Sequence, residues 1–123
     1  MSDQSIVTTK SGRAEGSVHN GLRVFKGIPY AAPPVGKLRW QPPQPVEPWS
    51  GVRPAKAYGP ISWQNPLAAP PDTPGVPDFG HNPMSEDCLS LNIWTPGLDD
   101  AHRAVLVWYT AGPSSWVPVR RDS

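Results

Sequence analysis

Histidine, cysteine and serine are the side chains of this 123-residue chain that could bind a metal ion or act in nucleophilic catalysis. The three histidines, His19, His81 and His102, stand in turn-like stretches, with no acidic residue at the spacing of a metal-ligand set. We therefore interpret them as loop or surface histidines. The sequence predicts no metal site and no cofactor site.

The candidate nucleophiles are weak. Ser114 and Ser115 have no histidine beside them in the sequence, and an unactivated hydroxyl is a poor nucleophile. Cys88 is the single cysteine, which excludes an internal disulfide and any cluster of cysteines around a metal. It could be a reactive thiol, but a structural cysteine ahead of an apolar strand is the commoner case. We expect no catalytic residue in this chain.

Three stretches have the pattern of β-structure. Asn20 and Gly21 are typical of a type I′ turn, and they lie between arms at residues 16–18 and 22–28, which predicts a hairpin. Residues 89–95 alternate apolar and polar side chains, as a half-buried strand does. Residues 104–108 form a continuous apolar run, typical of a strand that is covered on both faces.

The middle of the chain, from residue 29 to about residue 83, is irregular because it is rich in proline. The whole chain contains 18 Pro and 11 Gly, which argues against a helical bundle. Loops beyond about 12 to 15 residues are uncommon in compact domains. This segment therefore either wraps a larger body than the chain itself provides or presents proline-rich ligands to small binding modules.

Charge and hydropathy exclude two classes of partner. The net charge is +1, which is too small for the electrostatic footprint of a nucleic-acid binder. The apolar run at residues 104–108 is far shorter than the roughly 20 residues that span a bilayer, and residues 1–5 do not resemble a secretion signal. We expect a soluble, cytoplasmic chain with neither nucleic-acid nor membrane partners.

Two long motifs carry a family resemblance. FKGIPYAAPPVG (residues 25–36), with LRW (38–40) and PP (42–43) after it, and SEDCLSLNIWTP (85–96) resemble the signatures of the type B carboxylesterases. These are the cholinesterase-like branch of the α/β-hydrolases, and Ser90 stands where an aromatic residue or Thr is more usual. The resemblance covers about residues 12–108, and two long motifs in the right order are far more specific than a short pattern.

The resemblance implies an α/β class and an incomplete α/β-hydrolase fold. We expect an N-terminal β-hairpin, a long Pro-rich loop and the first strands of the central sheet. The residues that match the structural signature are Arg39, Glu86, Asp87 and Cys88. In the family the first two form an ion pair, so Arg39 and Glu86 should lie within about 3 Å of each other. The disulfide partner found in some members is absent, because Ser62 or Trp63 stands there.

The resemblance also implies a serine esterase with a Ser, His and acid triad and an oxyanion loop. None of the triad residues can be placed in this chain, which lacks a Gly-x-Ser-x-Gly motif. A His-Gly-Gly turn should follow Trp108, but the sequence continues Tyr-Thr-Ala-Gly-Pro. The expected domain is therefore residues 1–108, followed by a tail at residues 109–123.

The genetic code offers an explanation for the tail. A one-base shift after Trp108 is compatible with His-Gly-Gly-Ala-Phe-Leu-Val-Gly, and the last Gly is forced because Trp116 has a single codon. We infer a frameshift and an out-of-frame tail.

The expected function is that of an N-terminal fragment of a carboxylic ester hydrolase, inactive alone, with an ester as the substrate of a full-length enzyme only. A truncated, non-catalytic remnant or a small Pro-rich interaction protein is the alternative. The sequence leaves the oligomeric state open.

Overall fold

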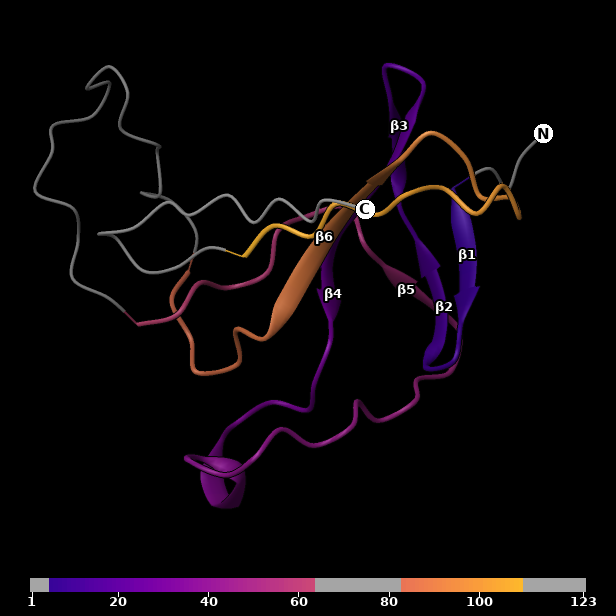
Figure 1. The fold of residues 1–123 in the computed structure, drawn as a ribbon. Helices are drawn as coiled ribbons and strands as arrows, with labels where there is room; N and C mark the ends of the chain where they lie inside the picture. Colours follow the sequence, from indigo (N-terminus) through magenta and orange to yellow (C-terminus); the bar gives the residue numbers. More distant parts are fainter. Residues whose placement is uncertain (1–4, 64–82, 110–123) are drawn as a thin grey trace, which may run out of the picture.

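The computed structural model describes residues 5–63 and 83–109, and Figure 1 shows their arrangement. Six strands form two three-stranded sheets, one in the order β1-β2-β5 and the other in the order β3-β4-β6. The strands are β1 (Ile6–Thr9), β2 (Gly12–Glu15), β3 (Ser17–His19), β4 (Leu22–Pro29), β5 (Val52–Pro54) and β6 (Ser90–Thr95). A short 3-10 helix, η1 (Gly36–Leu38), is the helical element of the part that the structure describes.

The predicted hairpin is formed by β3 and β4. These strands are antiparallel, and His19 pairs with Leu22 across the turn. Asn20 and Gly21 both have positive φ, 49° and 78°, as a type I′ turn requires. The turn residues therefore set the register of the hairpin.

A second hairpin, which the sequence analysis did not predict, is formed by β1 and β2. The Oγ1 atom of Thr9 closes its turn by donating to the carbonyl of Gly12 (2.8 Å) and accepting from the N–H of Ser11 (3.2 Å). Strand β5 then pairs in parallel with β2. A salt bridge between Lys56 Nζ and Glu15 Oε1 (2.8 Å) adds a contact beside this pairing.

The two sheets meet at a bulge in β4. The register between β4 and β6 shifts between Phe25 and Ile28, and Gly27 has a φ of 66°. At this point the N–H of Lys26 donates to the carbonyl of Ala55 (2.8 Å), which belongs to the segment after β5. The bulge thus turns one backbone donor of β4 away from its own sheet and toward the other.

The core of the described residues is small. Ala14, Phe25 and Ala55 are buried together, and Val7 and Ile28 pack against them. The cluster draws on both sheets and on the chain just after β5, so it lies where the sheets meet. Many larger apolar side chains stay exposed, among them Trp40, which is 90% exposed.

The strand predicted at residues 104–108 is not present, and that prediction was wrong. These residues form no strand, and Val105 and Leu106 are 83% and 78% exposed. A strand that is covered on both faces needs neighbouring strands and helices, and the described part of the chain supplies neither to this segment. The strand predicted at residues 89–95 is confirmed as β6.

The Pro-rich middle is described only in part, because residues 64–82 lie outside the described residues, as does His81. On either side of that gap, Ile61 and Met84 form an isolated parallel bridge. Ser114, Ser115 and the rest of the expected tail beyond Tyr109 also lie outside the described residues. Within the described ranges there is no helix long and apolar enough to cross a membrane.

Candidate functional site

Arg39 and Glu86 form the ion pair that the family resemblance implied. Arg39 follows η1, and its backbone N–H donates to the carbonyl of Gly36 (3.2 Å), which fixes the backbone at the C-terminal end of that helix. Arg39 Nε lies 2.8 Å from Glu86 Oε1. The contact joins two loops that are far apart in the sequence.

This ion pair lies at the surface. The two side chains are 59% and 38% exposed. Water therefore screens both charges, and the pair contributes about 0 to 1 kcal/mol to stability rather than the larger amount typical of a buried pair. The contact favours one arrangement of the loops and does little for the stability of the whole chain.

Asp87 and Cys88 connect Glu86 to the start of β6. The N–H of Asp87 donates to Ser85 Oγ (3.1 Å), and the N–H of Cys88 donates to the carbonyl of Glu86 (3.0 Å). Asp87 is exposed, and Cys88 is a free thiol of intermediate burial. The observed contacts of these residues shape the backbone, and a role as a family signature stays a prediction.

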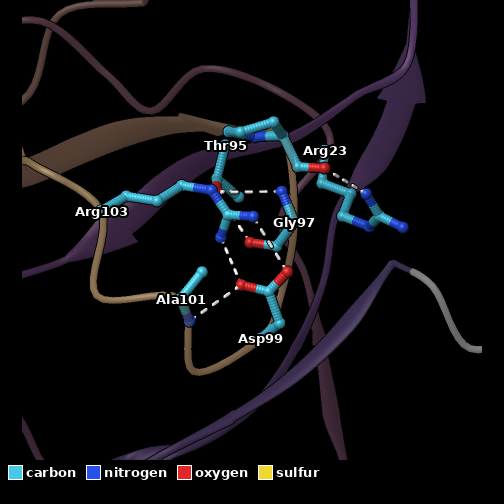
Figure 2. Close-up of polar contacts among 7 residues, drawn as sticks. Arg23, Thr95, Gly97, Asp99, Ala101 and Arg103 are labelled. Carbon is cyan, nitrogen blue, oxygen red and sulfur yellow. Dashed lines mark hydrogen bonds and ion pairs between the residues drawn. The ribbon is translucent and has the colours of Figure 1, made fainter.

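Beyond β6 the chain enters a polar turn that the sequence analysis missed (Figure 2). The Oγ1 atom of Thr95 donates to the carbonyl of Gly97 (2.8 Å), and Arg23 Nη1 of β4 donates to the carbonyl of Pro96 (2.7 Å). The guanidinium of Arg103 binds both carboxylate oxygens of Asp99, with Nη2 2.9 Å from Oδ2. The spacing of four residues between an acid and an arginine was the available signal.

The pKa of Asp99 follows from these contacts. The hydrogen bonds from the Arg103 side chain lower it to about 2, and the backbone N–H of Ala101 acts in the same direction. The same bonds raise the pKa of Arg103. Both side chains of the pair therefore stay charged at neutral pH. Their contact holds the turn in place, and neither side chain acts as a proton donor or acceptor there.

The chemistry of the remaining candidates is limited. His19 and His102 are both exposed, and the His19 ring lies beside the Asn20 amide (3.3 Å between Nε2 and Nδ2). Within residues 5–63 and 83–109, no group of three or more His, Cys, Asp or Glu could hold a metal ion. The expectation that this chain carries no catalytic, metal or cofactor site remains a prediction.

One apolar hollow of about 140 Å³ lies between the two sheets. Its lining residues are Val7, Thr9, Ala14, Phe25, Ile28, Trp49, Ile93, Thr95 and Leu98. The polar atoms of this lining are engaged elsewhere: Thr9 and Thr95 in their own turns, and Trp49 Nε1 with the carbonyl of Arg13 (2.7 Å). The hollow therefore offers shape and apolar contact but no group that could activate an ester or a water molecule.

Comparisons with known proteins point to one family. The model of the carboxylesterase family matches residues 3–117. Phenmedipham hydrolase of Pseudarthrobacter oxydans is 46% identical to 91% of this chain, and para-nitrobenzyl esterase of Bacillus subtilis (strain 168) is 40% identical to 87% of it. A solved carboxylesterase structure from Geobacillus stearothermophilus is 40% identical, with a TM-score of 0.71 over 85% of this chain and 19% of its own.

The described strands are thus part of an α/β-hydrolase fold, which is the fold of these structural neighbours. The chain belongs to the carboxylesterase family, as the two motifs predicted. It spans about a fifth of the length of the curated relatives, 22% of the phenmedipham hydrolase and 21% of the para-nitrobenzyl esterase.

Proposed function

We propose that this chain is the N-terminal part of a carboxylic ester hydrolase and that the residues for catalysis belong to a longer form of the protein. The observation that carries the proposal is the family match over residues 3–117, combined with coverage of about a fifth of the relatives. Ester hydrolysis by this family needs an activated serine, a histidine and an acid. Both described histidines are exposed: His19 ends β3 beside the hairpin turn, and His102 lies in the irregular chain after β6.

The role that the geometry supports for this part is to build the start of the fold. In this proposal the β3–β4 hairpin and β6 are the first strands of the central sheet, and the Pro-rich segment is the loop that wraps it. The Arg39–Glu86 pair supports this assignment, because it holds the early part of that loop beside the chain that leads into β6.

A frameshift after Trp108 is part of the proposal. It rests on the change from a family-like sequence to Tyr-Thr-Ala-Gly-Pro, and on the single codon of Trp116. In the shifted frame the codons are compatible with an oxyanion loop, which stabilises the charge that develops on an ester carbonyl. The exposure of residues 105–108 is what we expect of a strand whose neighbours are encoded further on.

The test has two parts. The first is the nucleotide sequence downstream of the Trp108 codon, which should continue in the shifted frame through a Gly-x-Ser-x-Gly motif. The second is hydrolysis of nitrophenyl acetate, which the frame-restored protein should catalyse and the 123-residue chain should not. Replacing the serine of that motif by alanine is the control, because it removes the nucleophile alone.

Two results would contradict the proposal. If the shifted frame stops before a Gly-x-Ser-x-Gly motif, the chain is a non-catalytic remnant or a small Pro-rich interaction protein. If the 123-residue chain releases a burst of nitrophenol that is lost in Ser114→Ala or Ser115→Ala, the nucleophile lies in the tail.

A further inference from the structure

The turn of the β3–β4 hairpin presents an Asn-Gly pair at its tip. Asn20 and Gly21 are both exposed, and the tip projects away from the junction of the two sheets (Figure 1). Apart from its chain neighbours, no described residue lies within 4 Å of the position that a Cβ on Gly21 would take. The backbone nitrogen of Gly21 therefore lacks the shielding that a side chain would give it.

The sequence neighbour of Asn20 distinguishes it from two of the other asparagines. The chain contains four asparagines, and Asn65 and Asn82 each precede a proline. Proline has no N–H, so its nitrogen cannot attack the preceding side chain and lose a proton. In Asn20, by contrast, the next residue offers an N–H on the least hindered residue type.

The fourth asparagine, Asn92, is held in place. It lies in β6, and its Oδ1 atom accepts the N–H of Gly27 (3.0 Å). The residue after it is Ile93, whose branched side chain crowds its own backbone nitrogen. Asn92 is exposed like Asn20, so it is a matched reference that differs in its side-chain bond and its neighbour.

A histidine ring lies against the side-chain amide of Asn20. The Nε2 atom of His19 is 3.3 Å from the Nδ2 atom of Asn20. This amide nitrogen needs a proton if it is to leave as ammonia, and imidazole is able to supply one near neutral pH. The turn thus places an attacking nitrogen and a proton donor on either side of one amide.

We propose that Asn20 is a modification site, at which the side chain loses ammonia and the residue becomes aspartate or isoaspartate, with His19 as the proton donor. The backbone nitrogen of Gly21 bonds to Cγ of Asn20 and gives its proton to water. The bond between Cγ and Nδ2 breaks, and this nitrogen takes a proton from His19 and leaves as ammonia. His19 regains its proton from water.

The intermediate is a cyclic imide, which water then opens. One water molecule cleaves either of the two bonds between the imide nitrogen and a carbonyl carbon. Cleavage at the side-chain carbonyl gives aspartate, and cleavage at the main-chain carbonyl gives isoaspartate. The site is complete within residues 19–21, so it needs neither ester hydrolysis nor any residue beyond the hairpin.

The two products differ in what they do to the hairpin. Aspartate leaves the main chain unchanged and tolerates the positive φ of 49° at residue 20. Isoaspartate routes the main chain through the side chain and adds a carbon atom to the turn. A turn lengthened in this way does not keep His19 opposite Leu22, so the isoaspartate form should lose the register of the hairpin.

The experiment is incubation of the full 123-residue chain in neutral buffer, followed by digestion after lysine and arginine and mass spectrometry. The peptide of residues 14–23 contains Asn20 and no other asparagine. Conversion raises its mass by about 1 Da, because an amide becomes a carboxyl group. Chromatography separates the aspartate and isoaspartate peptides, and the peptide that contains Asn92 is the reference in the same digest.

Two variants test the role of the histidine. His19→Gln keeps a polar side chain beside Asn20 but removes the imidazole. The matched control is His102→Gln, which removes the other exposed histidine of the described residues and leaves the hairpin unchanged. A folding defect in His19→Gln would loosen the turn and speed the reaction, so misfolding could not imitate a slower one.

We expect Asn20 to convert at least about tenfold faster than Asn92, whose side-chain bond alone should slow it by about threefold to tenfold. His19→Gln should slow the conversion of Asn20 by about threefold or more, and His102→Gln should not change it. In the isoaspartate fraction, amide exchange should become faster in β3 and stay unchanged in β1.

Three results would overturn the proposal. The first is conversion of Asn20 that is no faster than that of Asn92. The second is a rate in His19→Gln that equals or exceeds the rate of the unmodified chain, or a His102→Gln control that slows as much. The third is an isoaspartate fraction that is missing or that keeps the amide protection of β3.

Discussion

The side-chain oxygen of Asn92 in β6 accepts a hydrogen bond from the backbone N–H of Gly27 in β4, at 3.0 Å. Gly27 lies in the bulge, where the ladder between the two strands is interrupted and an N–H would lose its strand partner. The side chain therefore replaces a backbone acceptor at the point where β4 changes register. Because the adjacent Lys26 N–H binds the other sheet, this contact supports the junction of the two sheets.

Replacing Asn92 by alanine should loosen the bulge. A hydrogen bond of this kind contributes about 0.5 to 1.5 kcal/mol, so we expect faster amide exchange at Gly27 by about threefold to tenfold. The matched control is Asn92→Asp, which keeps an acceptor oxygen and should keep the protection of Gly27. Equal exchange rates in both variants would show that the side chain does not hold the bulge.

Gly12→Ala should destabilise the first sheet more than an ordinary glycine replacement does. A Cβ at Gly12, where φ is 145°, would lie 2.6 Å from Nε1 of the Trp49 indole, which is fixed by its bond to the carbonyl of Arg13. We expect a loss of about 1 to 3 kcal/mol from the steric conflict, measured as a lower urea midpoint of unfolding.

Gly51→Ala provides the comparison for that measurement. Gly51 also has a positive φ, 72°, but nothing lies near its missing Cβ, so only backbone strain is added. That strain amounts to about 1 kcal/mol. A smaller effect at Gly12 than at Gly51 would contradict the account of the Trp49 contact.

The Arg39–Glu86 pair should show weak, salt-dependent coupling. Both side chains are partly exposed to water, so a double-mutant cycle with Arg39→Gln and Glu86→Gln should give a coupling of about 0 to 1 kcal/mol. The coupling should shrink further in 1 M salt, where charges are screened within about 3 Å. A coupling of several kcal/mol that resists salt would mean that the pair is shielded from water.

The Asp99 carboxyl should titrate well below an ordinary aspartate. Its pKa is about 2 in the folded chain against 3.8 for an unperturbed side chain. The folded value is the lower one, so the Asp99–Arg103 turn contributes stability above pH 3.8, and that contribution is lost as the pH falls toward 2. Carboxyl NMR titration should show the pKa rise toward 3.8 in Arg103→Gln, and an unchanged value would disprove the assigned cause.

Local sequence determined the elements whose conformation depends on neighbouring residues. Asn20 and Gly21 specify a turn because both tolerate positive φ, and the alternation in residues 89–95 suits a strand. The family was also readable from the sequence alone, since the two motifs are long and ordered. The β1–β2 hairpin was missed, although Ile6, Val7 and Thr8 form a β-branched run ahead of a Gly turn.

Only the tertiary structure decided whether the apolar run at residues 104–108 becomes a strand. Its composition favours a strand, yet a strand exists only where another chain segment supplies hydrogen-bond partners, and no segment of the described structure does so. The same holds for the Arg39–Glu86 pair: the resemblance predicted the contact, but the fold alone set its exposure. Exposure depends on what surrounds a pair in space, and it therefore decides how strongly water weakens that pair.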